Sequence, residues 1–302
     1  MQKYEYRPLD QSLEEIRLLR LLPGSFKDKL CVEMFHASLR DPTIPPISSR
    51  LSLKELRKTL PKEWNAFETL ERDIIFADRH RNLASTHPDP NFDSPLHGPV
   101  PDHPGPTFEP KYEALSYTWD PQLPRERVCV QSQDRKVRFG LVRHCNLTVG
   151  RNLALALRHL RYPQESRVLW IDAISIDQRN NGERNEQVKR MGKIFSFAQR
   201  VVVWLGESTH NSDKAMETLD FLGAQAEPLV GHGWGASLGG SKRDWFKATT
   251  KLPYETETWK AIESLLSRPW FARTWVWQEI QLANRHSIVQ CGKTYKSWPT
   301  LR

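Results

Sequence analysis

The sequence of 302 residues lacks the features that define several common protein classes. It has no uninterrupted run of about 18 apolar residues, which a membrane-spanning helix requires. The polar N-terminus, MQKYEY, lacks the apolar segment of a signal peptide. The chain also has no GxxxxGK[ST] segment and no GxSxG segment, which excludes P-loop nucleotidases and hydrolases with a nucleophile elbow. We therefore expect a soluble, cytoplasmic protein with no membrane span.

Cysteine is scarce and follows no pattern. The four cysteines, Cys31, Cys129, Cys145 and Cys291, form no CxxC pair. Sparse cysteine in a chain without a secretion signal indicates free thiols in a reducing compartment. The histidines between Thr86 and Pro110 also lack the spacing of metal ligands. We expect neither a metal site nor a resident cofactor.

The balance of charge is basic but evenly spread. Lysine and arginine together number 44 and aspartate and glutamate 36, which gives a net charge of +8. Both signs alternate along most of the chain, and this mixture is typical of a solvated surface. A role in nucleic-acid binding would rest on the net charge alone, so we do not expect a nucleic-acid partner.

The first 110 residues divide into two parts. Two short apolar runs, 16–22 and 29–35, flank the turn dipeptide Pro23-Gly24 and predict a β-hairpin. Apolar residues then recur at helical spacing between 52 and 83, and Pro61 divides this stretch into two predicted helices. A segment rich in Pro, His, Asp and Gly follows and predicts an irregular loop. We interpret the chain as an N-terminal lead-in (1–40), a helical and Pro-rich insertion (41–110) and a main domain (111–302).

From Tyr112 onward, apolar strands alternate with amphipathic helices. The predicted strands are 112–117, 128–130 with 136–139 as a hairpin, 168–171, 201–205 and 287–291. The predicted helices are 152–160, 183–198, 212–222, 255–266 and 273–283. Continuous apolar strands separated by helices predict an α/β fold with a mainly parallel sheet covered on both faces. Such sheets bind ligands at the carboxyl ends of their strands, here just after Tyr117, Ile171 and Leu205.

Three segments carry side chains suited to binding or catalysis. LSYTWD ends the first strand of the main domain, and WIDAISIDQ leaves the next buried strand and leads into a helix. RTWVWQE lies on a predicted helix, where Trp275 and Glu279 are four residues apart and share a face. The candidate ligand-binding residues are Ser116, Tyr117, Trp119, Asp172, Asp177, Gln178, Arg184, Gln187, Arg273, Trp275 and Gln278.

These segments resemble the motif blocks of the fungal heterokaryon incompatibility (HET) domain. That family has an ALSYxWG strand, a WIDAICINQ strand followed by ER..QV..M..I, a vvvWLG strand and an R.W..QE helix. This chain has ALSYTWD, WIDAISIDQ with ERNEQVKRMGKIF, VVVWLGE and RTWVWQE in the same order. Asp120 replaces the usual Gly, Ser175 a common Cys and Asp177 a common Asn. The loss of that Cys weakens any thiol-based mechanism.

The resemblance covers Tyr112 to Trp298, and IRLLRLLPG is similar to the usual lead-in of the family. The family continues into a helix where this chain stops, at Arg302, so we expect the natural protein to be longer. The resemblance implies a fungal effector of heterokaryon incompatibility or innate immunity that triggers programmed cell death. It also implies self-association and signalling proteins as partners.

The HET family is proposed to be a distant relative of the TIR domain, a flavodoxin-like parallel sheet of which some members cleave NAD. That comparison implies that Glu279 is the catalytic residue and that NAD is the candidate substrate. An NAD(P) glycohydrolase would stack Trp119 and Trp275 on the substrate rings and bind the pyrophosphate through Arg184 or Arg273. A non-enzymatic, self-associating signalling module is the alternative, and both mechanisms stay open.

Structural roles for the same residues also stay open. Glu279 can form an ion pair with Arg273 or Arg184, and Asp172 can hold backbone N–H groups at the end of its strand. The segment 231–236 fits the dinucleotide pattern GxGxxA, but it follows no predicted strand and opens no predicted helix. We therefore reject a dinucleotide fingerprint there.

Overall fold

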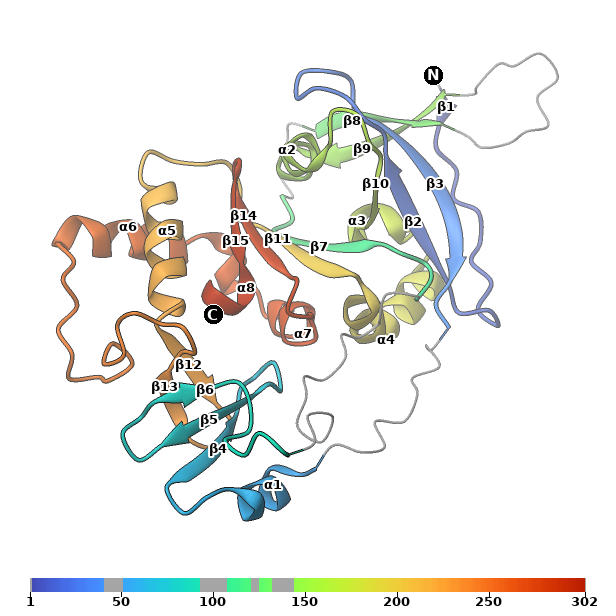
Figure 1. Ribbon diagram of the computed structural model, residues 1–302. Helices are drawn as coiled ribbons and strands as arrows, with labels where there is room; N and C mark the ends of the chain where they lie inside the picture. Colours follow the sequence, from blue (N-terminus) through green and yellow to red (C-terminus); the bar gives the residue numbers. More distant parts are fainter. Residues whose placement is uncertain (1, 41–50, 93–107, 121–124, 132–143, 302) are drawn as a thin grey trace.

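The structure is a computed structural model that describes residues 2–40, 51–92, 108–120, 125–131 and 144–301. A ten-stranded mixed sheet crosses the molecule in the order β1-β9-β8-β3-β2-β10-β7-β11-β14-β15 (Figure 1). Its strands are β1 (Gln2–Lys3), β2 (Glu15–Leu21), β3 (Cys31–Ser38), β7 (Glu113–Tyr117), β8 (Arg125–Gln131), β9 (His144–Gly150), β10 (Arg167–Trp170), β11 (Arg200–Trp204), β14 (Ile288–Cys291) and β15 (Thr294–Ser297).

Four neighbouring strands of this sheet, β10, β7, β11 and β14, are parallel. In chain order they are the second, first, third and fourth of the set, which is the flavodoxin-like order. In that order the ligand crevice lies at the carboxyl ends of the first and third strands, where the connections diverge. The relevant strands here are β7 and β11. The prediction of an α/β fold with a mainly parallel sheet flanked by helices is confirmed.

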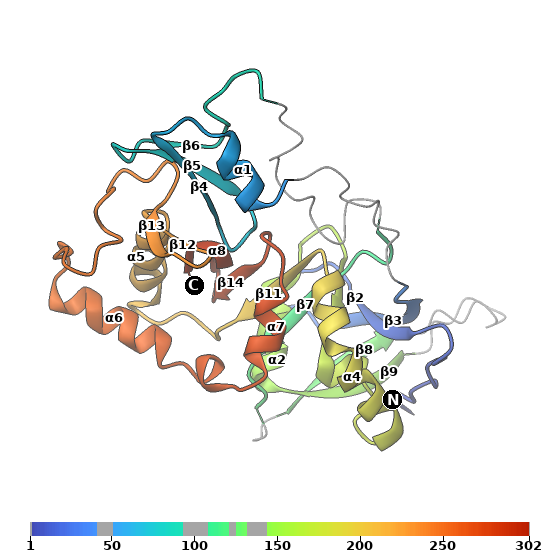
Figure 2. The ribbon, with the colours of Figure 1, turned by 90° about the horizontal axis from the view of Figure 1, so that it is seen from below.

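The helices cover the two faces of the sheet with two separate apolar layers (Figure 2). They are α2 (Arg151–Leu160), α3 (Asp172–Ser175), α4 (Asn181–Phe197), α5 (Ser212–Gly223), α6 (Thr256–Leu266), the 3-10 helix η2 (Pro269–Ala272), α7 (Val276–Gln281) and α8 (Trp298–Leu301). Helix α1 (Leu53–Thr59) does not cover this sheet, because its buried Leu56 belongs to a third apolar cluster with Ala66, Ile74 and Phe76. Side chains alternate along β11, so Val201 and Val203 contact the layer of α4 to α7, whereas Val202 and Trp204 contact that of α2. Among the helices of the described residues, none combines the length and hydropathy that a bilayer crossing requires.

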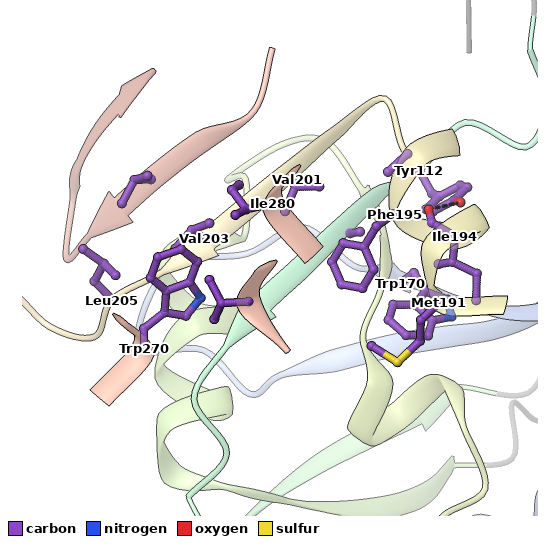
Figure 3. Close-up of a cluster of buried hydrophobic side chains, with 14 of the residues drawn as sticks. Tyr112, Trp170, Met191, Ile194, Phe195, Val201, Val203, Leu205, Trp270 and Ile280 are labelled. Atoms are coloured by element: carbon purple, nitrogen blue, oxygen red, sulfur yellow. Dashed lines mark hydrogen bonds between the residues drawn. The ribbon is translucent and has the colours of Figure 1, made fainter. Parts of the chain in front are cut away.

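The layer that contains α4 and α7 is the larger of the two cores, and Figure 3 shows its centre. Trp170 packs edge-on against Phe195 of α4, with ring centroids 5.6 Å apart. The Tyr112 hydroxyl donates a 2.6 Å hydrogen bond to the Ile194 carbonyl oxygen. The ring contact of Trp170 and the hydrogen bond of Tyr112 together fix the position of α4 against the sheet.

The N-terminal hairpin is present as predicted, because β2 and β3 pair antiparallel from Glu15↔Ser38 to Leu21↔Val32. The second predicted hairpin differs from expectation, since β8 pairs with β9. The predicted partner at 136–139 lies outside the described residues. The helix predicted at 273–283 is also shorter, and η2 precedes it.

The insertion is not mainly helical: the first of the two predicted helices is present as α1, but the prediction of the second is wrong. Helix α1 ends before Pro61, and a small antiparallel sheet follows, made of β4 (Trp64–Glu68), β5 (Ile74–Asp78) and β6 (Leu83–Ala84). A tight turn causes the difference, since Thr69 N donates to the Asp73 oxygen at 2.9 Å and Arg72 has a positive φ of 64°. The β-branched and aromatic residues on either side of that turn favour strands. In the described part of the predicted loop, 86–92 and 108–110, there is no helix or strand.

The small sheet of the insertion lies beside a second hairpin, formed by β12 (Ala226–Leu229) and β13 (Gly233–Ala236), in both ribbon views. A bridge between Thr69 and Leu229 and a 2.8 Å hydrogen bond from Val230 N to the Glu68 oxygen join them. The segment 231–236 therefore does follow a strand, contrary to the prediction. It continues into β13, and not into the helix that a dinucleotide fingerprint requires.

Candidate active site

The three motif segments meet at the carboxyl edge of the parallel strands. Ser116 and Tyr117 end β7, Asp172 follows β10, and Glu279 lies on α7. Since β7 and β10 are parallel neighbours, their carboxyl ends adjoin. The alternation along β7 directs Ser116 to the side of α4 to α7 and Tyr117 to the side of α2.

Glu279 is the centre of a buried hydrogen-bond network. Its side chain accepts a short hydrogen bond from the Ser116 hydroxyl, and Arg273 Nη2 donates to Oε1 at 3.1 Å. Trp270 Nε1 in turn donates to Ser116 Oγ at 2.8 Å. Glu279 is only 2% exposed, so the Arg273 guanidinium compensates a carboxylate that water barely reaches. One of the two structural alternatives, the ion pair with Arg273, is therefore present.

Arg273 also holds the end of β7. Its Nη1 donates to the Tyr117 carbonyl oxygen at 2.5 Å. One guanidinium thus binds a strand end and a helix carboxylate together, a use of its several donors that a lysine cannot match. The position of Glu279 relative to the strand end depends on this residue.

Asp172 forms the second acidic position of the site. Trp119 Nε1 donates to Oδ2 at 2.7 Å, and Ala173 N donates to Oδ1 at 2.7 Å. Gln178 Nε2 donates to the Asp172 carbonyl oxygen at 2.9 Å, which fixes the turn after β10. Asp172 therefore does bind a backbone N–H at the strand end, as its structural alternative predicted.

Burial raises the pKa of Asp172 from 3.8 to about 7. The hydrogen bonds from Trp119 and Ala173 lower this pKa, the negative charge of Glu279 raises it, and Arg273 opposes the rise. Burial also raises the pKa of Tyr117 well above its usual value, and the charge of Asp172 adds to the effect. The site therefore holds a carboxyl group that exchanges a proton near neutral pH beside a phenol that stays neutral.

We call this set of residues the strand-end cluster. Its members are Ser116, Tyr117, Trp119, Asp172, Trp270, Arg273 and Glu279. The indole of Trp119 is 46% exposed although its Nε1 is bonded, so its ring is open to solvent. Trp275 caps α7 and is 52% exposed, and Gln278 is exposed one turn further along. Trp275 and Glu279 thus have very different environments, although they are four residues apart.

The other predicted residues lie apart from the strand-end cluster. Arg184 is exposed on α4. Gln187 is buried, and its Nε2 donates to the Glu15 carbonyl oxygen of β2 at 3.2 Å. Asp177 lies in the turn before α4, where its backbone N–H donates to Glu183 Oε1 at 2.8 Å.

That turn contains an ion pair which the sequence reasoning missed. Arg17 of β2 is fully buried and donates to Glu183 Oε1 at 2.8 Å and to the Ser175 carbonyl oxygen at 2.6 Å. Its guanidinium also lies 4.7 Å from the ring centroid of Tyr6. An arginine inside the apolar strand pattern IRLLRLL is the signal that could have revealed a buried charge in need of a partner. For Trp270, the other missed residue, the sequence gives no comparable signal.

Within the described ranges, no three His, Cys, Asp or Glu side chains are grouped to hold a metal ion. The strand-end cluster brings together two carboxyl groups, a guanidinium, a serine hydroxyl, a phenol, the exposed indole of Trp119 and the buried indole of Trp270. Carboxylates next to aromatic faces suit a ligand that carries a sugar and a flat ring.

Comparison with known proteins bears on this site directly. The family model described as "Heterokaryon incompatibility protein (HET)" matches residues 112–279, a span that ends at the central glutamate of the cluster. A Neurospora crassa protein named "Heterokaryon incompatibility protein 6, OR allele" is 30% identical over 202 residues, which cover 61% of this chain and 29% of that relative. The chain thus spans less than a third of this relative's length. No solved structure matches the chain.

Proposed function

The chain belongs to the heterokaryon incompatibility (HET) family, and from that premise we propose that it is a fungal effector of heterokaryon incompatibility and innate immunity that triggers programmed cell death. The name of the Neurospora relative supports the first part of this role. That relative is much longer than the aligned region, so its whole activity does not transfer with the alignment.

The mechanism we propose is hydrolysis of the N-glycosidic bond of NAD or a related dinucleotide at the strand-end cluster, as in some TIR domains. One observation carries this proposal: side chains 163 residues apart in the chain, Ser116 and Glu279, meet at the carboxyl edge of β7, one of the two strands at the switch point. Ligands of flavodoxin-like sheets bind at that place. The proposed partners are other copies of this chain, bound through self-association, and other signalling proteins.

Glu279 is the proposed catalytic residue. Cleavage of a nicotinamide–ribose bond develops positive charge on the ribose ring, as in glycoside hydrolysis. A carboxylate held in position by Ser116 and Arg273 can stabilise that charge once the substrate is bound. A substrate would have to reach the buried carboxylate by displacing one of these two donors, and Ser116 is the less costly one because it is uncharged.

Asp172 supplies the second function that hydrolysis requires. A carboxyl group with a pKa of about 7 can accept a proton from the attacking water at neutral pH. The exposed indoles of Trp119 and Trp275 offer flat surfaces on which nicotinamide or adenine can stack. Arg273 is partly exposed and is the nearest cation for the pyrophosphate, whereas Arg184 lies outside the cluster.

The test is release of nicotinamide from NAD by the purified chain, at low concentration and under crowding that favours assembly. Glu279→Gln is the informative variant, because glutamine keeps the shape and accepts the Ser116 hydrogen bond but carries no charge. Glu263→Gln on the exposed face of α6 is the matched control. Release by the wild-type chain and the control, with a loss of at least about 100-fold in Glu279→Gln, supports the hydrolase. Equal activity in the wild-type chain and both variants rules out Glu279 as the catalytic group.

The alternative is a non-enzymatic, self-associating signalling module. A specific observation favours it: Glu279 is 2% exposed, and both of its carboxylate oxygens are bonded within the protein. This alternative predicts that Glu279→Gln still kills fungal cells, whereas substitution of exposed aromatic residues such as Trp234 and Trp259 abolishes killing. The hydrolase predicts the reverse order of effects.

A further inference from the structure

Two of the four cysteines are direct neighbours in the sheet, although they are far apart in the sequence. Cys31 of β3 and Cys129 of β8 are Cα partners in the parallel pairing of these strands. Their thiols form a hydrogen bond with each other. Cys129 is almost fully buried, whereas Cys31 is partly exposed. Neither residue takes part in the strand-end cluster.

The backbone geometry is suited to a bond between these sulfurs. Neighbouring strands lie about 4.8 Å apart, and directly opposed residues point to the same face of the sheet. A disulfide requires Cα atoms roughly 4.4–6.8 Å apart, so the strand spacing falls inside the range without movement of the backbone. Directly opposed cysteines on one face of a sheet are the arrangement from which such a bond closes.

The other two cysteines do not share this arrangement. Cys145 of β9 is the partner of Val130, so it points to the face opposite that of Cys129. Cys291 lies on β14, which is separated from β3 by four strands of the sheet, β2, β10, β7 and β11. Cys31 and Cys129 are therefore the one cysteine pair that the described strands place face to face.

We propose that Cys31 and Cys129 form a reversible disulfide that locks the seam between the β2–β3 hairpin and the β8–β9 hairpin. Three residue pairs join β3 to β8 at this seam, whereas seven join β2 to β3 and seven join β8 to β9. The seam is therefore joined less extensively than either of the hairpins that it connects. A covalent bond there holds together strands that lie on either side of the insertion in the sequence.

Exchange with glutathione disulfide supplies a balanced route. The Cys31 thiolate attacks one glutathione sulfur, forms a mixed disulfide and releases one glutathione thiolate. The Cys129 thiolate then attacks the Cys31 sulfur and releases the second glutathione. The protein dithiol is oxidised and glutathione disulfide is reduced to two glutathione molecules, with both thiol protons passing to solvent or to the released thiolates.

Cys31 reacts first because it is partly exposed, whereas Cys129 is buried and does not contact glutathione disulfide in solution. Lys29 and Arg161 favour the Cys31 thiolate, but burial and the neighbouring thiol outweigh them and raise the pKa of Cys31. Since the thiolate is the reacting form, the bond should close faster as the pH rises.

The experiment incubates the intact, folded chain in glutathione buffers of increasing oxidation, blocks free thiols with an alkylating reagent and maps the peptides by mass spectrometry. We expect a peptide linked through Cys31 and Cys129, with Cys145 and Cys291 alkylated. Hydrogen exchange of the β8 amides should slow in the oxidised form, and reduction with dithiothreitol should restore it. Cys145→Ser is the matched control and should form the same linked peptide.

Two variants test the order of attack and guard against misfolding. Cys129→Ser should accumulate glutathione on Cys31, and Cys31→Ser should form no link and little adduct on Cys129. Circular dichroism of each serine variant checks that the fold is intact. The proposal is overturned if the folded chain in the most oxidising buffer keeps both thiols free, or if the link joins Cys145 or Cys291 instead.

Discussion

Trp119 and Asp172 are joined by a 2.7 Å hydrogen bond from the indole Nε1 to the carboxyl Oδ2, across 53 residues of sequence. This bond connects the first motif segment to the second, and it lowers the pKa of the carboxyl group against the effect of burial. Trp119→Phe removes the donor and keeps the aromatic ring. We expect the pKa of Asp172 to rise above about 7 by roughly one unit, the usual size for one hydrogen bond to a charged group.

The titration can be followed by the carboxyl carbon resonance of Asp172 in protein labelled with carbon-13 at aspartate. Trp234→Phe is the matched control, because it changes an exposed tryptophan on β13. An unchanged midpoint in Trp119→Phe would mean that the indole does not hold the carboxyl group in solution.

The raised pKa of Asp172 also makes stability depend on pH. The folded chain keeps a proton up to about pH 7 that the unfolded chain releases near its ordinary value of 3.8. The free energy of unfolding should therefore fall as the pH rises from about 4 to about 7, and then stay level. Asp172→Asn resembles the protonated side chain and should remove this decline.

The two proteins should be similar at about pH 4, while Asp172→Asn should be more stable at pH 8 by roughly 1–2 kcal/mol, since partial solvent contact reduces the full effect. Urea unfolding at a series of pH values measures the difference. Asp213→Asn on α5 controls for the loss of one negative charge. Parallel curves for wild type and Asp172→Asn would contradict the assigned shift.

The network around Glu279 predicts a graded loss of stability. Glu279→Ala leaves Arg273 without its carboxylate partner and Ser116 without its acceptor, and should cost about 3 kcal/mol. Glu279→Gln keeps one acceptor oxygen, which can still bind the Ser116 hydroxyl, but its amide nitrogen cannot accept from Arg273, so it should cost about 2 kcal/mol. Chemical denaturation gives both values. If the two substitutions lower the free energy of unfolding by the same amount, the charge of Glu279 contributes more to stability than its hydrogen bonds.

The strands of the main domain could be predicted closely because they are continuous apolar runs. The run 201–205, for example, corresponds to β11 at Arg200–Trp204. The prediction failed where the local pattern suits two structures. Between 64 and 78, apolar spacing fits a helix as well as a strand, and the turn at Thr69–Asp73 decides the outcome through contacts that the spacing does not reveal.

The candidate site, like the fold, could be predicted only in part. Motif blocks identified Ser116, Asp172 and Glu279, and the rule for parallel sheets predicted that strand-end residues would adjoin. The hydrogen bond from Trp270 to Ser116 could not be predicted, because it depends on how η2 packs beneath β7. The exposed position of Arg184 on α4, outside the hydrogen bonds of the cluster, likewise could not be predicted from its place in the motif.

The buried pair of Arg17 and Glu183 should contribute strongly to folding. Glu183→Gln leaves a fully buried guanidinium without a counter-charge and should lower the free energy of unfolding by about 3–5 kcal/mol.

Glu186→Gln, one turn along α4, is the control. Glu186 pairs with Lys189 at the surface, so its substitution should change stability by less than about 1 kcal/mol. The double variant Arg17→Met with Glu183→Gln should be less damaging than the sum of the single changes. Additive costs would mean that the two side chains act independently.

Gly223 at the end of α5 sets how closely the C-terminal helix α8 can pack. A Cβ at this position would lie 1.7 Å from the Thr300 carbonyl oxygen, and a backbone atom cannot move aside as a flexible side chain can. Gly223→Ala should therefore displace α8 and break the 2.6 Å hydrogen bond from the Thr300 hydroxyl to Asp220. We expect a loss of about 2 kcal/mol in the free energy of unfolding, in the range of overpacked sites, with faster hydrogen exchange confined to α8 and β15.

Gly182→Ala is the matched control: its Cβ would meet a single side-chain oxygen of Asn180 at 3.3 Å, and alanine favours the helix. A Gly223→Ala protein as stable as Gly182→Ala would show that α8 does not pack on α5 in solution.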